Sequence, residues 1–282
     1  VLASGIVGAF STTQLASLTS SQMQSLTTSA IGSVQTTQVS GLQAVDLATL
    51  STSQVASITT GVINLLNTTQ IQAINSAGVA ALGSSQLQAI TTTSLSNMLS
   101  AQFGALSTTQ LSNLTTSQTA SLISTQVVSL SSEKLYALST DQINSLSTSS
   151  IAQLSGAQVA ALSTAQVYAM GTSQIEVLTT AHMLAVTNAQ LQALGTSQVG
   201  ALTTTNLKTL TGAQIGRFST DQLRTLSTTG QIQSIANDSF QSFTSTQLQS
   251  LTTAQVANLT TSSTGQISSL NLLVNNLSSS QV

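Results

Sequence analysis

Few residues in this chain of 282 amino acids could do chemistry, and their spacing gives no known active-site pattern. His182 is the single histidine, four residues are Lys or Arg, six are Asp or Glu, and there is no cysteine. A Ser-His-Asp nucleophile needs an imidazole between a hydroxyl and a carboxylate, and neither a nucleophile elbow nor an acid in register accompanies His182. Thiol nucleophiles and Cys/His metal cages lack their residues. We therefore assign no catalytic, cofactor-binding or metal-binding residue, and we expect no cofactor and no enzymatic activity.

Two tyrosines and a scatter of charged side chains are the remaining candidates. Tyr136 and Tyr168 are expected to project outward, where an aromatic ring can be a stacking platform for a sugar or a partner. The charged residues fall mostly on the expected outer face, where we expect them to add solubility and not to form a site: Glu133, Lys134, Asp141, Glu176, Lys208, Arg217, Asp221 and Arg224.

The balance of charge and apolar residues indicates a folded chain that associates with itself. The chain is 40% hydrophobic with a formal net charge of −2, whereas disordered chains combine low hydrophobicity with high net charge. So weak a field gives no basis for binding nucleic acid or an anionic membrane surface. The longest apolar stretch, around Val62 to Leu66, is far shorter than the roughly 20 residues of a membrane span. Because a net charge near zero favours association, the expected partner is the protein itself.

An eight-residue repeat runs through almost the whole chain. From Leu18 an apolar residue recurs at every eighth position as far as Leu226. We name the eight positions a to h, with Leu18 at a. Position a is mostly Leu, b and c are Ser or Thr, e is Gln, f is Leu, Ile or Val, and h is Ala or Ser. A fixed short period of this kind is typical of solenoid proteins.

The residue types at b, c and d predict one short helix in each repeat. Position c holds Ser, Thr, Asn and Gly, the residues preferred at a helix N-cap. Position b accepts Gly and Asn, which suits a left-handed residue at the end of the preceding helix. Acids, which favour a first helical turn, occupy position d at Glu133, Asp141, Asp221 and Asp238. We therefore predict that each helix ends at b and the next begins after c.

The alternative to a helix is a strand, and the two differ in where a and f point. A helical wheel places a, e and f on one side, an apolar arc edged by Gln, with d, g and h opposite. In a strand, a and f point to opposite faces, and a β-solenoid with corners at b and c would cover both. The predicted fold is an all-α solenoid of very short helices, one in each eight-residue repeat, with a β-solenoid as the alternative.

Helices of about six residues are unstable alone, so the repeats must stack on one another. Small residues at h, such as Ala73 and Ala161, are expected to let neighbouring helices approach closely. We assume two helices in each superhelical turn.

The repeat defines one long domain and an irregular end. We predict a continuous solenoid over residues 1–259, with a one-residue insertion near Gly230. Residues 260–282 leave the register until Leu277, and we expect a cap or a contact between subunits there. Both ends of the chain lie inside a repeat, so we expect either a piece of a longer array or bare ends that join head to tail.

The repeat resembles the octapeptide arrays of large secreted bacterial surface proteins, whose units have the form Thr-Thr-x-Gln-Ile/Val-x-Ala-Leu. The sequences Leu-Thr-Thr-Ala at 178–181 and Leu-Thr-Thr-Ala-Gln-Val at 251–256 carry this resemblance, which extends from Leu2 to Leu259. It implies a structural role outside the cell or at its surface, and it transfers no functional residues.

These observations together predict a non-enzymatic extracellular structural protein, a stiff rod that assembles into a filament, sheath or surface fibre. The alternative is an adhesin stalk, or a binding surface for glycan, mineral or ice presented on a solenoid. Ice binding would favour the β-solenoid, because flat ladders of Thr need the spacing of strands. The absence of cysteine and the Ser/Thr-rich surface suit an extracellular or cell-surface location.

Overall fold

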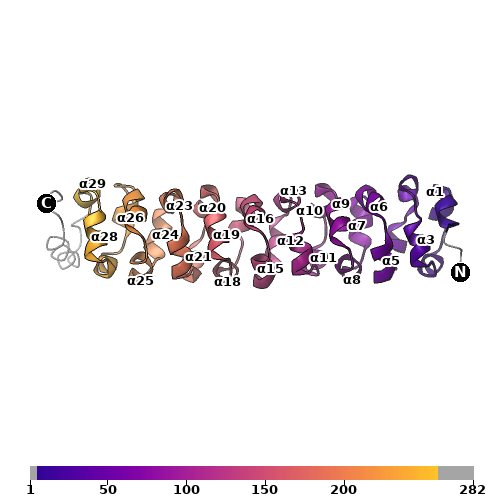
Figure 1. The fold of residues 1–282 in the computed structure, drawn as a ribbon, viewed down its shortest axis with the longest axis horizontal. Coiled ribbons are helices and arrows are strands. Elements are labelled where there is room, and N and C mark those ends of the chain that lie inside the picture. Colours follow the sequence, from indigo (N-terminus) through magenta and orange to yellow (C-terminus); the bar gives the residue numbers. More distant parts are fainter. Residues whose placement is uncertain (1–4, 260–282) are drawn as a thin grey trace. The chain divides into compact units, whose positions relative to one another are not determined.

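The computed structural model describes residues 5–259 and is all-helical over that range. The chain forms two compact units, Val1–Ser150 and Ile151–Val282. Within each unit, short helices follow one another around successive windings of a solenoid (Figure 1). The described residues contain no strand, so the β-solenoid alternative is wrong. Residues 260–282, with the predicted cap or subunit contact and the return to the repeat at Leu277, lie outside the described residues.

The helices of the first unit have three to six residues each. They are η1 (Val7–Ala9), α1 (Thr12–Ala16), α2 (Ser20–Gln24), α3 (Thr28–Gly32), η2 (Thr36–Gly41), α4 (Ala44–Leu47), α5 (Thr52–Ser57), α6 (Thr60–Leu65), α7 (Thr68–Ala73), α8 (Ser76–Ala80), α9 (Ser84–Ala89), α10 (Thr92–Ser96), α11 (Ser100–Gly104), α12 (Thr108–Ser112), α13 (Thr116–Ala120), α14 (Ser124–Val128), α15 (Ser132–Tyr136) and α16 (Thr140–Ser145), where η denotes a 3₁₀-helix.

The boundary between the units falls within α17 (Thr148–Ala152). The helices that follow are α18 (Gly156–Ala160), α19 (Thr164–Ala169), α20 (Thr172–Glu176), α21 (Thr180–Ala185), α22 (Asn188–Ala193), α23 (Thr196–Ala201), α24 (Thr204–Thr209), α25 (Gly212–Ile215), α26 (Thr220–Thr225), α27 (Gln231–Ser234), η3 (Asn237–Ser242), α28 (Ser245–Ser250) and α29 (Thr253–Ala257).

Each regular helix begins at position c, and its N-cap is the residue at b. In α2, the Thr19 side chain accepts a hydrogen bond from the backbone N–H of Gln22, and the Gln22 side chain accepts one from the backbone N–H of Thr19. This reciprocal pair is a capping box, which satisfies two N–H groups that a helix start otherwise leaves unpaired. The prediction that c is the N-cap was therefore wrong by one residue. Position b also carries Ser and Thr, so cap composition suits either position, and the Gln at e selects the residue three positions before it.

The glycines at b do not adopt the left-handed conformation that we predicted for them. Gly83, Gly171 and Gly195 have φ values of −71°, −68° and −70°. Each is an extended N-cap residue whose backbone N–H is donated to the Gln at e, and this geometry is open to any residue. Among the described residues, Gly230 alone has a positive φ, at 92°.

One winding of the solenoid takes between three and four repeats, and not the two that we assumed. Helices three repeats apart pack together, as α13 does with α16 and α18 with α21. Helices four repeats apart are also joined, because Gln54 of α5 donates to the carbonyls of Gln24 and Leu26, 30 and 28 residues earlier. Because the backbone between helices is extended at a and b, each repeat turns the chain by only a quarter to a third of a circle.

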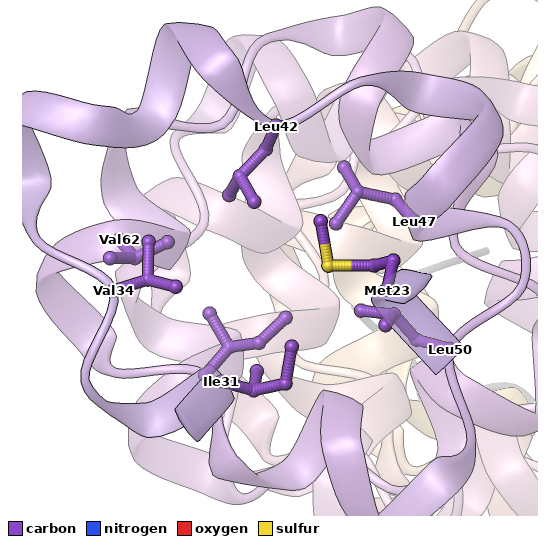
Figure 2. Close-up of a pocket in the computed structure, with 8 residues that line it drawn as sticks. Met23, Ile31, Val34, Leu42, Leu47, Leu50 and Val62 are labelled. Carbon is purple, nitrogen blue, oxygen red and sulfur yellow. The ribbon is translucent and has the colours of Figure 1, made fainter. Parts of the chain in front are cut away.

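The apolar residues at a and f fill the interior of each winding, as the helical wheel predicted. In Figure 2 the side chains of Met23, Leu47 and Leu50 point toward the same interior space as Ile31 and Val34. Met23 and Leu47 are 1% exposed. The space between the lining side chains is about 10 Å³, at the limit of one water molecule, and its walls are apolar. The interior is therefore close-packed and dry.

Small residues set how closely neighbouring windings approach. A Cβ atom at Gly156 of α18 would lie 2.9 Å from the carbonyl oxygen of Ala181 and 2.9 Å from the Cβ of Ala185, both in α21. Ala185 occupies position h, where we expected small residues to allow such contacts. Any side chain at Gly156 would force these two helices apart.

At Gly230 the repeat accommodates one extra residue without losing its bonding pattern. The backbone N–H of Ser227 donates to Gln231 Oε1 at 2.7 Å, across four residues where the other capping boxes span three. Gln231 Nε2 still reaches back to the Leu202 carbonyl at 2.7 Å, now 29 residues earlier. The positive φ of Gly230 lets the chain loop out beside the cap, a conformation that costs glycine little.

No helix within residues 5–259 is long and apolar enough to cross a membrane.

Candidate functional site

The most extensive polar arrangement in the protein is a ladder of buried side chains at position e, the Gln ladder. Gln118 in α13 is 3% exposed. Its Oε1 accepts the backbone N–H of Thr115 at 3.1 Å, which caps its own helix. Its Nε2 donates to the carbonyls of Leu87 and Ile90 at 2.8 and 2.9 Å, in the winding before. One side chain therefore closes a helix N-terminus and ties two windings together.

The same bonding recurs in both units, so the Gln ladder runs along the interior of each. Without it, carbonyls at position a that accept these amides, such as that of Ile90, would be buried without this partner, which costs about 1–3 kcal/mol for each group. The residues whose amide donates to the preceding winding include Gln38, Gln54, Gln70, Gln86, Gln102, Gln110, Gln118, Gln126, Gln142, Gln190, Gln198, Gln214, Gln222, Gln231, Gln247 and Gln255.

His182 belongs to this ladder and copies the bonds of the glutamine it replaces. The ring is 1% exposed. Nδ1 accepts the backbone N–H of Thr179 at 3.1 Å, and Nε2 lies 2.6 Å from the carbonyl oxygen of Leu154. Because a carbonyl only accepts hydrogen bonds, Nε2 is the donor of this pair. Both ring nitrogens are thus engaged with backbone, which leaves neither for a substrate or a metal.

Residues other than Gln at position e also donate hydrogen bonds to backbone carbonyls of the preceding winding. Asn206 donates to the carbonyl of Leu178 at 2.7 Å, Ser94 donates to that of Leu66 at 3.2 Å, and the Lys134 ammonium donates to that of Gly104. Lys134 is therefore tied to the backbone of an earlier winding and only partly exposed.

Asp46 is the acidic member of the Gln ladder, and the sequence analysis missed it. It is 2% exposed, and a carboxylate cannot donate to a carbonyl. Instead Ser20 donates its hydroxyl to Asp46 Oδ1 at 2.8 Å from the winding before. The direction of the bond between windings is reversed at this position. The place of Asp46 at e, where most repeats have Gln, was the signal that could have revealed it.

The remaining charged side chains whose exposure the structure describes are on the outer face. Glu133, Asp141 and Asp221 lie in the first turns of α15, α16 and α26, where the helix dipole favours acids. Arg224 Nε donates to the Ser250 carbonyl at 3.0 Å. Within the described residues no three His, Cys, Asp or Glu side chains gather into a metal-binding group. The exposed charged residues are Glu133, Asp141, Glu176, Lys208, Arg217, Asp221 and Arg224.

The two tyrosines both project outward, as predicted, and Tyr168 borders a surface depression. Tyr136 and Tyr168 are 60% and 63% exposed. The depression beside Tyr168, here called the Tyr168 hollow, has a volume of about 450 Å³. Its lining comes from α19, α20, α23 and the residues before them: Tyr168, Met170, Gly171, Thr172, Gly195, Thr196, Ser197 and Gln198. The sequence analysis singled out Tyr168 but not this hollow.

A comparison with models of protein families supports the repeat. The family model for the ALTTAQ repeat matches residues 132–164 and 151–188. Among solved structures, the chain is similar to the leucine-rich repeat-containing protein LegL7 from Legionella pneumophila. The identity is 11%, with 74% of this chain and 80% of that chain covered, and the TM-score is 0.21. Comparison with curated protein sequences gives no match.

Proposed function

We propose that this protein is a non-enzymatic structural repeat protein that assembles with copies of itself into a filament, sheath or surface fibre outside the cell. The observation that carries the proposal is the Gln ladder. Within each unit, neighbouring windings meet through repeated buried amide donors and backbone carbonyls, and the ALTTAQ repeat supports this regularity.

The interface between windings is open-ended, and this is why it favours assembly. In the Gln ladder the amide donors lie on one side of a winding and the carbonyl acceptors on the other, so this contact is head-to-tail and does not close on itself. Contacts of this kind between copies generate filaments.

The composition supports the remaining parts of the proposal. A formal net charge of −2 leaves little repulsion between copies that lie side by side. The near absence of acid-base pairs supports a role without catalysis. A surface of hydroxyl and amide groups without cysteine suits a location outside the cell or at its surface.

Electron microscopy of the purified protein tests the proposal. We expect continuous filaments with a regular axial repeat at low salt, and the same filaments at about 1 M salt, because few ion pairs exist for salt to screen. Light scattering across a range of salt concentrations gives the same comparison in solution. Discrete particles at all concentrations, or disassembly by salt, would overturn the assembly.

The alternative function, a stalk or binding surface, is favoured by one observation, the Tyr168 hollow. Binding to ice would need Thr residues at the spacing of β-strands, whereas the described residues form helices. Binding of a glycan would require only the hollow and no strands.

A further inference from the structure

The Tyr168 hollow exists because two neighbouring windings lack a side chain at the same place. Gly171 and Gly195 both occupy position b, three repeats apart, before α20 and α23, which pack against each other. Most other repeats carry Ser, Thr or Asn at this position. Neither glycine is needed for the backbone, because both have the extended conformation open to any residue. The glycines therefore serve to leave space.

The Tyr168 ring forms one wall of this space. A Cβ atom added at Gly195 would lie 3.5 Å from Tyr168 Cε2, so the ring lies directly beside the missing side chain. The ring is 63% exposed. The Tyr168 ring therefore offers an aromatic surface next to the space that the two glycines leave.

The floor of the hollow is rigid. Gln198, itself 5% exposed, donates to the carbonyls of Val167, Tyr168 and Met170 at 2.9, 3.2 and 2.7 Å. Its Oε1 accepts the backbone N–H of Gly195 at 2.8 Å. The Gln ladder thus holds the backbone on both sides of the ring and at one of the two glycines, so that little ordering would be needed when a ligand binds.

The rim of the hollow is neutral and rich in hydroxyl groups. Thr172, Thr196 and Ser197 are exposed on it. No charged side chain lines it. Its volume of about 450 Å³ is in the range of small-ligand sites.

We propose that the Tyr168 hollow binds a neutral saccharide. The C–H groups on one face of a sugar ring are slightly positive and pack on the negative face of an aromatic ring, while sugar hydroxyls pair with Thr and Ser hydroxyls at the rim. A charged ligand would find no counter-charge here, and a purely apolar ligand would leave the rim hydroxyls unpaired. This binding goes beyond self-assembly, and either activity can be present without the other.

Fluorine NMR tests the proposal directly, because the chain has only two tyrosines. In protein labelled with 3-fluorotyrosine, Tyr168 reports on the hollow. Tyr136 is the internal reference, since it occupies the same g position but is followed at b by Ser139. Titration with cellohexaose, maltohexaose and chitohexaose, up to about 10 mM each, is expected to move the Tyr168 signal with at least one sugar and to leave the Tyr136 signal in place.

Two sets of variants separate the hollow from a general effect on folding. Gly171→Ser with Gly195→Ser restores the residue found at b in other repeats, keeps the fold and fills the space, so binding should be lost. Tyr168→Ala should weaken binding by at least about tenfold, whereas Tyr136→Ala should leave it unchanged. Isothermal titration calorimetry measures each affinity.

Three results would overturn the proposal. The first is a Tyr168 signal that none of the sugars moves. The second is binding that survives in the folded double serine variant. The third is a Tyr168 signal that changes with protein concentration and not with sugar, which would assign the hollow to a contact between copies.

Discussion

Glutamine occurs both at the inner position e and at the outer position g of the repeat. At both positions it makes similar hydrogen bonds, but the surroundings differ. Gln118 at position e and Gln88 at position g each donate to a carbonyl of a neighbouring winding, Gln118 to Leu87 at 2.8 Å and Gln88 to Asn113 at 2.7 Å. Gln118 is 3% exposed, whereas Gln88 lies in solvent. The two hydrogen bonds are nearly equal in length. Their energies should differ because water replaces a lost partner only at the outer position.

The largest difference is expected when a carboxylate replaces the amide. Gln118→Glu keeps the shape but places a buried negative charge against the carbonyls of Leu87 and Ile90, and should cost about 4 kcal/mol or more of unfolding free energy. Gln88→Glu in solvent is the matched control and should change stability by less than about 0.5 kcal/mol. Urea denaturation at neutral pH measures both. Equal effects would contradict the assignment of e to the interior and g to the surface.

Removal of the inner amide should have the next largest effect. Gln118→Ala leaves the buried Ile90 carbonyl and the Thr115 N–H without their partner and removes one of the two donors to the Leu87 carbonyl, and we expect a loss of about 3 kcal/mol. Because stability in a solenoid is a sum of terms between neighbours, the loss should be local. Amide hydrogen exchange should become faster in the windings around α13 and stay unchanged at a distance. A loss spread evenly over the chain would argue against nearest-neighbour coupling.

Replacement of His182 tests whether the Gln ladder requires a glutamine side chain, or only a side chain that makes the same two hydrogen bonds. His182→Gln should change stability by less than about 1 kcal/mol, because the amide offers the same acceptor and donor. His182→Ala removes both bonds and should cost about 2 kcal/mol. Thermal unfolding of the two variants beside the parent protein checks the order. If glutamine were as disruptive as alanine, the imidazole would have a role that the ladder does not explain.

The smallest effect is expected on the outer face. Gln88→Ala removes one exposed hydrogen bond to Asn113, which water replaces, and should cost at most about 0.5 kcal/mol. Its chemical denaturation midpoint should overlap with that of the parent protein. A loss as large as that of Gln118→Ala would show that outer glutamines hold the windings together as firmly as inner ones do.

Much of the fold could be predicted because the same residue types recur at the same positions in many repeats. Apolar residues at a and f, with Gln at the edge of their arc on the helical wheel, were enough to predict short helices and which face each one buries. The helix start was misplaced by one residue because Ser and Thr occupy both b and c. Only the observed hydrogen bond that the Thr19 backbone N–H donates to the Gln22 side chain distinguishes the cap from its neighbour.

The candidate site was predictable only in part. Tyr168 was identified as an outward aromatic residue, but the hollow beside it depends on Gly171 and Gly195 meeting across two windings. That meeting depends on the number of repeats in a winding, for which the assumption of two was wrong. Asp46 was missed for the same reason, because its partner Ser20 lies in the preceding winding.

The sequence by itself determined the period, the helical conformation and the inward face of each repeat, because these follow from interactions within eight residues. The tertiary structure decided how many repeats make a winding, and with it which donor meets which carbonyl. The physical reason is that the geometry of the extended link at a and b sets this number, and no residue type at those positions encodes the angle by which the chain turns. The second role of Gln118, a bond to Ile90 28 residues earlier, exists only once that angle has placed the two windings together.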